Sequence, residues 1–215
     1  MMTAALLLLA DGRFPAGGHA HSGGAAAAVA AGTVTDVPSL ERFLLGRLHT
    51  VGLTAAGLAA AAARTADPAE LAELDRATEA RTPSAALRAV SRRLGRQLLR
   101  AARAGWPADA GLAALPAGTH HPVVLGTAAR AAGLTDRRAA ELAVHEAVSG
   151  PATAALRLLG LDPYQLVAVL ARLAPQLDLV AERAATATRL PAASAPLLDL
   201  YGERYDSWKV KLFAS

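Results

Sequence analysis

The sequence predicts an all-α fold, because its composition favours helices and its apolar segments are separated by helix caps and breakers. Alanine and leucine, both strong helix formers, dominate a chain in which 53% of residues are apolar and only 4% are aromatic. Isoleucine is absent, and residues that favour strands are scarce. We expect a compact single-domain bundle of roughly eight to ten helices at residues 1–200, with a C-terminal tail at 201–215.

The first half of the chain contains several helix start and stop signals. A short apolar helix is expected over 3–10, then a loop over 11–18 that pivots at Pro15. The further expected helices are 22–31, 40–64 with Ser39 or Asp36 as its cap, and 68–80 with Asp67 as cap and Pro68 at its first position. Glycines 46, 52 and 57 would allow close packing of the second of these helices, at some cost in propensity.

Residues 82–105 give the clearest amphipathic pattern. One face carries Leu87, Val90, Leu94, Leu98 and Ala101. Arginine recurs every four residues on the opposite face, as Arg88, Arg92, Arg96 and Arg100. This arginine stripe is consistent with a solvated face or with a docking surface for an acidic partner.

The second half continues the helical pattern. A helix is expected from Pro122 to Gly133, and another from Thr135 through Val148, where Pro151 would kink or break it. Asp162 and Pro163 open the next helix. Residues 191–215 change character: they hold both lysines and several aromatic residues and show no obvious helix. We expect this segment either to dock on the body or to serve a partner.

Composition bounds the function and the location. The chain has no cysteine, which excludes disulfides and thiolate chemistry and is compatible with the cytoplasm. The net charge of +4 comes with arginine in place of lysine, a bias that high-GC coding also produces. The apolar N-terminus lacks a preceding positive charge, and Asp11 follows it closely, unlike a signal peptide. The uncharged stretches 14–35 and 48–63 are too rich in alanine and glycine for confident membrane spans.

The stretch "FPAGGHAHSGG" at 14–24 raises the question of catalysis or metal binding. No phosphate-loop motif occurs, and no lysine precedes position 209. His19 and His21 are two apart, and His120 and His121 are adjacent, which are poor spacings for one ion. His21 and Ser22 are neighbours and cannot form the usual base–nucleophile pair.

Two alternatives stay open on residues alone. One is a helical metal-dependent hydrolase that uses His21, or His145 with Glu141 one helical turn away. The other is a basic helical nucleic-acid binder, which requires cations clustered on one face.

Four segments resemble, in the right order, the motifs of the UreF family of urease accessory proteins. They are "LLLLADGRFPAGGHAHSGG", "SRRLGRQLL", "HHPVVLGTAARAAG" and "SAPLLDLYGERYDSWKVKLFAS". The matching residues are Asp11, Pro15, Gly17, Gly18, His21, Ser22, Gly24, Arg92, Gly95, His120, Gly126, Pro196, Leu198, Asp199, Arg204, Leu212, Phe213 and Ser215. The sequence departs from the family pattern at His19, where an aromatic residue is usual, at Ala25 and Ala26, at Tyr205 and at Lys211, which keeps charge but not a bidentate fork.

The resemblance implies a non-enzymatic, homodimeric scaffold that bridges the GTPase UreG and the accessory protein UreD (also called UreH) during GTP-dependent nickel insertion into apo-urease. It implies no stably bound cofactor on this chain, since UreG binds GTP and Mg and nickel is the cargo of the complex. The UreG side is expected at Pro15, Gly17, Gly18, His19, His21, Ser22 and Gly24. A middle-helix surface is expected at Arg92, Gly95 and Arg96, and the UreD side at Arg204, Tyr205, Lys211, Leu212, Phe213 and Ser215. Neither nucleic acid nor a membrane is an expected partner.

Overall fold

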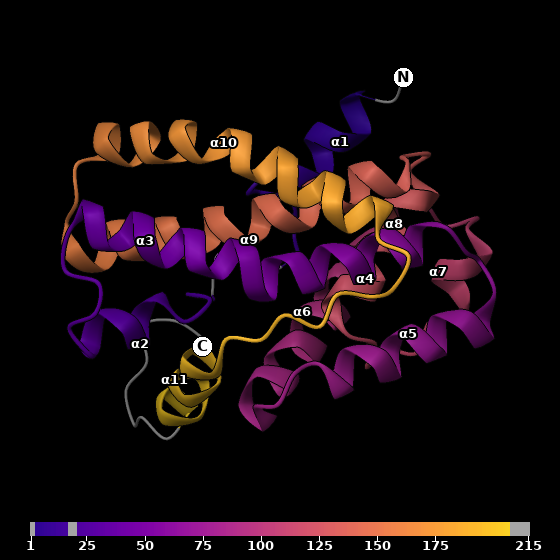
Figure 1. The fold of residues 1–215 in the computed structure, drawn as a ribbon. Coiled ribbons are helices and arrows are strands. Elements are labelled where there is room, and N and C mark those ends of the chain that lie inside the picture. Colours follow the sequence, from indigo (N-terminus) through magenta and orange to yellow (C-terminus); the bar gives the residue numbers. More distant parts are fainter. Residues whose placement is uncertain (1–2, 17–20, 207–215) are drawn as a thin grey trace.

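The computed structural model describes residues 3–16 and 21–206, and within them every regular element is helical (Figure 1). The predicted all-α class is confirmed. The elements are α1 (Thr3–Ala10), α2 (Ala25–Ala30), α3 (Val37–Arg47), the π-helical segment η2 (Leu48–Gly52), α4 (Leu53–Ala63), α5 (Pro68–Ala80), α6 (Ala85–Gly105), α7 (Ala110–Ala114), α8 (His121–Ala131), α9 (Asp136–Leu159), α10 (Pro163–Thr186) and α11 (Pro196–Asp206). Segments α3, η2 and α4 follow one another without a break, as the single predicted helix over 40–64 requires.

The core forms where α4, α8 and α9 pack together. α10 runs alongside α9 on one side of the molecule, and α5, α6 and α11 lie toward the other side (Figure 1). Alanines fill much of the buried face of α4, including Ala56, Ala59, Ala60 and Ala62. Against them, a Cβ at Gly126 of α8 would overlap the carbonyl oxygen of Ala59. The helices therefore pack with their backbones close together and little side-chain volume between them.

The predicted caps are present. The side chains of Asp36, Asp67, Thr135 and Asp162 each accept a hydrogen bond from a backbone N–H in the first turn of the helix that follows. Each cap satisfies one of the donors that a helix start leaves without an intrahelical partner. These residues explain why the starts of α3, α5, α9 and α10 fall close to the expected positions.

The sequence predicts that Pro151 kinks or breaks its helix. It does not break the helix, since α9 continues through Pro151 to Leu159. An interior proline costs about 3 kcal/mol because it removes one backbone hydrogen bond. The residues around Pro151 are buried against the core, and that packing offsets the cost. The carbonyl oxygen of Ala147, four residues earlier, accepts a hydrogen bond of 2.9 Å from Arg47 Nε instead.

The segment between α10 and α11 runs across α4 as an extended strap (Figure 1). Thr54 Oγ1 donates to the Ala193 carbonyl at 2.9 Å, and the ring of Pro191 occupies the space that a Cβ at Gly57 would need. Gly52 likewise lies close to Ala147, whereas Gly46 faces open space. Two of the three glycines in this helix therefore allow close packing, as expected.

The C-terminal part differs from the expectation of no obvious helix, since residues 196–206 form α11. Leu198, Tyr201 and Tyr205 of this helix are buried against the body, and α11 packs on α6 and α2. The helix depends on this tertiary docking, which local propensity does not reveal. Lys211, Leu212, Phe213 and Ser215 lie outside the described residues.

One stretch of the described residues, Val37–Ala63, is long and apolar enough to cross a membrane. In its most apolar window 56% of the residues are buried inside the fold, and a core helix of a soluble protein passes the same test.

Candidate functional site

The described part of the N-terminal motif forms a turn before a helix, as predicted, and its side chains at His21 and Ser22 are buried against the body. His21 is 7% exposed and Ser22 is fully buried. Gly23 and Gly24 then adopt left-handed φ values of 56° and 91°, and α2 begins at the next residue. A side chain at either position would be strained, which explains the glycine pair. Gly17, Gly18 and His19 lie outside the described residues.

Three other elements, α3, α9 and α11, cover the glycine turn. A Cβ at Gly23 would lie 2.8 Å from Pro151 Cγ of α9 and 3.1 Å from Arg47 Nη2 of α3. A Cβ at Gly24 would lie 3.1 Å from Leu198 of α11. The motif is therefore seated between the proline of α9 and the C-terminal helix.

The side chain of Arg47 packs against this turn. Its Nε donates to the Ala147 carbonyl that Pro151 leaves without a backbone partner. Burial lowers the pKa of Arg47 to about 10, and the side chain stays a cation at neutral pH. The predicted site did not include Arg47, and no local sequence signal separates it from Arg42, five residues earlier.

His21 of the motif lies close to ionisable side chains of the body. We name the set the His21 cluster: His21, Arg93 of α6, His121 of α8 and Glu146 of α9. Glu146 Oε2 lies 3.6 Å from His121 Nε2. Arg93 and His121 are close enough to His21 for their charges to act on it, and Arg93 Nε is buried. The N-terminal motif thus meets three helices of the body through one polar cluster.

Burial sets the protonation states within the His21 cluster. It lowers the pKa of His21 to about 4, with Arg93 and His121 adding to the effect, and it lowers the pKa of His121 to about 4. Burial raises the pKa of Glu146 to about 7, against a smaller opposite effect of His145. Both imidazoles are therefore neutral at pH 7, while Glu146 is close to its midpoint.

A second set, named here the His120 network, comprises Asp75 and Glu79 of α5, Ser91 and Arg92 of α6, and His120. His120 is fully buried, and its Nε2 lies 2.8 Å from Glu79 Oε2 while its Nδ1 lies 3.0 Å from Ser91 Oγ. The backbone N–H of His120 donates to Asp75 at 2.7 Å. Hydrogen bonds from His120 and Arg92 hold the pKa of Glu79 below its usual range.

The structure divides the arginine stripe of α6. Arg92 donates to Asp75, to Glu79 and to the Gly118 carbonyl, and Arg88 pairs with Glu79 at 2.9 Å. Arg96 and Arg100 are exposed and form no ion pair among the described residues. Of the predicted middle-helix surface, Arg96 is thus available to a partner, whereas the guanidinium of Arg92 is engaged within the chain.

Close packing of α6 on α8 requires a glycine at position 95. A Cβ on this residue would overlap the carbonyl oxygen of Thr119, because α6 crosses the start of α8 at this point. Gly95 therefore sets the spacing that brings Ser91 to His120.

α11 is bound to the start of α6 by two carboxylates. Ser84 Oγ and the Ala86 N–H donate to Glu203 Oε1 at 2.6 and 3.1 Å, and the Ser84 N–H donates to Asp199 at 3.3 Å. Tyr201 and Thr33 share a hydroxyl–hydroxyl hydrogen bond of 3.0 Å. Of the two described residues predicted for the UreD side, Tyr205 is buried and Arg204 is exposed.

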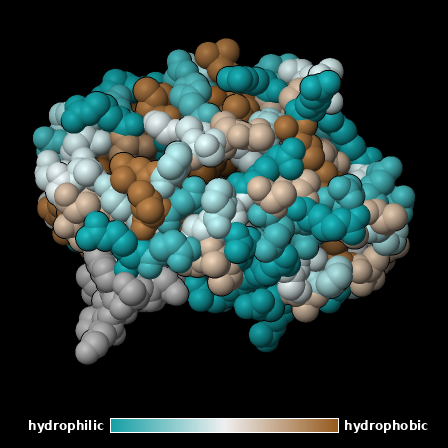
Figure 2. Space-filling view, turned by 60° about the horizontal axis from the view of Figure 1, so that its bottom comes forward, coloured by the Kyte–Doolittle hydropathy of each residue, from teal (hydrophilic) through white to brown (hydrophobic). Residues whose placement is uncertain are grey.

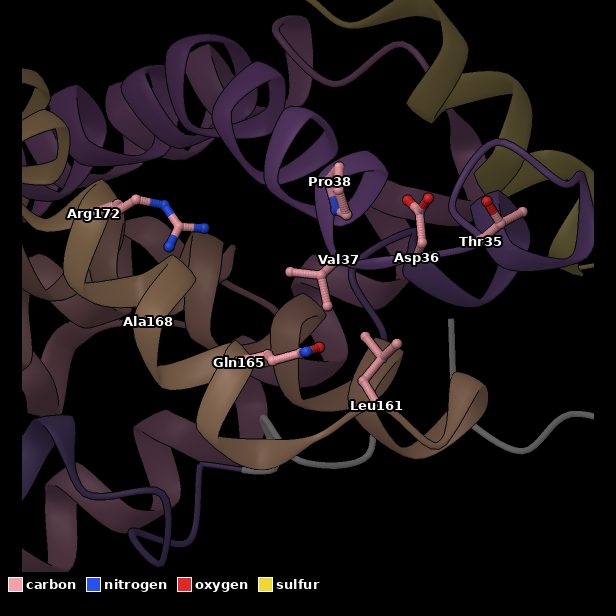
Figure 3. Close-up of a pocket in the computed structure, with 8 residues that line it drawn as sticks. All are labelled: Thr35, Asp36, Val37, Pro38, Leu161, Gln165, Ala168 and Arg172. Carbon is pink, nitrogen blue, oxygen red and sulfur yellow. The ribbon is translucent and has the colours of Figure 1, made fainter.

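A surface groove of about 520 Å³ lies between the start of α3 and the start of α10, and its lining residues form no assembled catalytic group (Figure 3). Its two charged residues, Asp36 and Arg172, stand apart in Figure 3. Asp36 caps α3, and Arg172 pairs with Glu41 at 2.6 Å. Within residues 3–16 and 21–206, no three His, Asp or Glu side chains are placed to hold a metal ion.

These features define an all-helical protein whose distinctive polar side chains hold the N-terminal turn and the C-terminal helix on the body. A protein-family model described as UreF matches residues 34–174. The chain is 45% identical to a protein named "Urease accessory protein UreF" from Mycolicibacterium vanbaalenii, over 99% of this chain and 98% of that protein. It is 42% identical to the protein of the same name from Mycobacterium tuberculosis, again over 99% and 98%. The chain belongs to the UreF family of urease accessory proteins, and it is not an enzyme.

Proposed function

We propose that this chain is a urease maturation scaffold that bridges the GTPase UreG and UreD/UreH in the cytoplasm, for GTP-dependent nickel insertion into apo-urease. One observation supports it most directly: the two end segments assigned to different partners lie side by side, with Gly24 against Leu198 and Thr33 bonded to Tyr201. A scaffold needs its two docking sites on one rigid body. In this proposal nickel is the cargo, and GTP and Mg are bound by UreG.

The UreD side can be tested by truncation, because α11 ends before the terminal residues begin. A chain ending at Asp206 keeps the contacts of Leu198, Tyr201 and Tyr205. A chain ending before Tyr201 loses two of these buried residues. Co-purification with UreD should be lost in both truncations, whereas Arg13→Ala, which alters only an exposed residue, is the matched control. Unimpaired UreD binding by the chain ending at Asp206 would show that residues 207–215 do not carry the UreD site.

The middle-helix surface can be tested by charge reversal. Arg96→Glu with Arg100→Glu changes two exposed residues that form no ion pair with any described residue, so the fold should persist. We expect weaker co-purification with UreG or UreD if this surface docks an acidic partner. Unchanged binding of both partners would reduce it to a solvated face. Arg157→Glu, at an exposed position of α9, provides a charge reversal elsewhere.

Self-association is supported by the outer face of α10. Tyr164 and Val167 near one end and Leu179 near the other are 84%, 64% and 62% exposed, and exposed alanines lie between them. In an antiparallel pair of α10 helices, Tyr164 would lie beside Leu179 of the second copy, so the face is self-complementary. We propose that it contributes to a homodimer. Val167→Glu should give a monomer by light scattering, while Leu7→Glu on α1 should not; a dimeric Val167→Glu protein would refute the assignment.

The nucleic-acid alternative receives less support. On α6, Arg88 and Arg92 are engaged by carboxylates and Arg103 by carbonyl oxygens of the α7 region. The face that Figure 2 brings forward is broadly hydrophilic, with separate apolar patches. A binding constant for DNA that fell steeply with salt would revive this alternative.

A further inference from the structure

A second groove lies between α3 and the start of α11, next to the glycine turn. Its volume is about 360 Å³, within the range of about 300–1,000 Å³ that is typical of ligand pockets. Phe43 of α3 and Leu197 and Leu198 of α11 give it an apolar wall, and Leu197 is 54% exposed. Its lining also includes Arg42 and Arg47 of α3, but no carboxylate from the described part of the chain. We name it the arginine groove.

The hydroxyl groups that line the arginine groove already donate within the chain. Those of Ser39, Thr50 and Thr33 donate to oxygen atoms of nearby residues. Because the proton of Thr33 is used in this way, Tyr201 must be the donor in the hydroxyl–hydroxyl hydrogen bond between them. The side-chain donors that remain for a ligand are those of the two guanidinium groups, and both groups are cations.

Neither cation has a carboxylate partner within residues 3–16 and 21–206. Arg42 is exposed, and Asp36, which its charge reaches, is held by Ser39 in the helix cap without an ion pair to Arg42. Arg47 is largely buried. Its one hydrogen bond to a described residue runs from Nε to the Ala147 carbonyl, so its terminal Nη groups have no acceptor there. The groove therefore combines an apolar wall with two charges that an anion would compensate.

We propose that the arginine groove is a docking site for an acidic side chain of UreD/UreH, a glutamate or aspartate that is followed by an apolar residue. The guanidinium groups would hold the carboxylate by charge-assisted hydrogen bonds, and the apolar neighbour would cover Phe43 and Leu197. α11 forms one wall of the groove and leads to the terminal residues assigned above to UreD, so the choice of partner rests on that proposal. The preference for a carboxylate is a property of the isolated chain.

Peptide titration of the isolated full-length chain tests the chemistry of the groove. The probe is the tripeptide acetyl-Leu-Glu-Leu-amide, and the neutral acetyl-Leu-Gln-Leu-amide is its matched control. The methyl NMR signals of Leu197 and Leu198 report binding, since both side chains line the groove. The acidic peptide should bind on the order of 10-fold more tightly, because hydrogen bonds between ionised groups are stronger than those to a neutral amide.

Substitutions separate the charged part of the groove from its apolar wall. Arg42→Gln, at an exposed position, should fold normally and lose most of the preference for the acidic peptide. Arg157→Gln, at an exposed position of α9, should keep it. Leu197→Asn should weaken the binding of both peptides alike, whereas Leu8→Asn, on α1, should not. No binding of the acidic peptide, equal binding of the two peptides, or an undiminished preference in Arg42→Gln would overturn the groove as a carboxylate site.

Co-purification with UreD tests the partner separately. Arg42→Gln should retain several-fold less UreD than the native chain or Arg157→Gln. If Arg42→Gln retains as much UreD as the native chain, UreD does not occupy the groove, although the scaffold proposal stands. If the native chain itself fails to bind UreD, the scaffold proposal fails and the choice of occupant fails with it, whereas the peptide preference of the groove is unaffected.

Discussion

His120 and His121 are neighbours in the chain but belong to clusters with opposite electrostatics. In the His120 network, two carboxylates face one imidazole and the guanidinium of Arg92, and each partner has a hydrogen bond of good length. In the His21 cluster, Glu146 lies 3.6 Å from His121, and Arg93 acts on His21 as a nearby cation. Charged hydrogen bonds thus connect the members of the first set, whereas burial keeps both imidazoles of the second set neutral.

The largest expected effect comes from a substitution that disrupts the His120 network by displacing a helix backbone. Gly95→Ala would place a Cβ on the carbonyl oxygen of Thr119 and push α6 away from the start of α8. We expect a loss of about 3 kcal/mol or more in the free energy of unfolding, measured by chemical denaturation. Gly105→Ala, at the end of the same helix with open space around it, should cost little. Equal stability of the two variants would contradict the close approach.

The next largest effect is expected at Arg47, which contacts the glycine turn next to His21. Arg47→Met keeps much of the side-chain volume but leaves the Ala147 carbonyl without its donor opposite Pro151. We expect a loss of about 2 kcal/mol, because a buried polar group left without a partner costs about 1–3 kcal/mol. Arg42→Met, at an exposed position of the same helix, serves as the control. A neutral Arg47→Met would mean that water replaces the guanidinium.

Two matched carboxyl substitutions test how much the charge of Glu79 stabilises the His120 network. Glu79→Gln removes the charge that pairs with Arg88, Arg92 and His120. The side chain is 43% exposed, so we expect a modest loss of about 1 kcal/mol in denaturation at pH 7. Glu73→Gln, whose ion pair with Arg76 is on the surface, should be close to neutral. A loss no larger than that of Glu73→Gln would show that the network gains nothing from this charge.

Glu146→Gln should have the smallest effect at neutral pH and a clear effect on the pH dependence. His21 and His121 have lowered pKa values, so their contribution to stability is present above pH 6.5 and is lost as the pH falls toward 4. Glu146 has a raised pKa, so its contribution is present below pH 4.5 and is lost as the pH rises toward 7.

Between pH 6.5 and 4.5, unfolding of the native chain takes up two protons on imidazoles and releases one from Glu146. The native free energy of unfolding should fall with acid by at most about 1.4 kcal/mol per pH unit, and that of Glu146→Gln by at most about twice as much. Denaturation curves at several pH values measure both slopes. Identical slopes would place Glu146 outside the titrating cluster.

Sequence reasoning found the helices that carry their own signals and missed the features that depend on tertiary contact. Asp67 with Pro68 and Asp162 with Pro163 mark helix starts through local chemistry, and the structure confirms them. The continuation of α9 through Pro151 depends on Arg47, which is 104 positions earlier in the chain, and no local rule contains that pairing. α11 likewise forms because its buried residues dock on α6 and α2.

The candidate site was predicted in part for the same reason. The glycine pair at 23 and 24 has a local signature, since left-handed φ values favour glycine. Arg93, Glu146, Asp75 and Glu79 carry no such signature, because only the packing of α5, α6, α8 and α9 brings them to the histidines. The partner roles of Gly17, Gly18, His19 and the terminal residues stay predictions.

The alanine-lined contact of α4 with α8 has a consequence for how the chain tolerates mutation. In most cores, replacing a large side chain with a small one lowers stability, because the lost atoms leave a void. Here the buried residues are already near the smallest size, so truncation removes little. Enlargement is the hazard, since each added methyl must separate two backbones. A deep mutational scan should therefore show, at Ala56, Ala59 and Ala60, tolerance of serine or glycine and intolerance of valine and leucine.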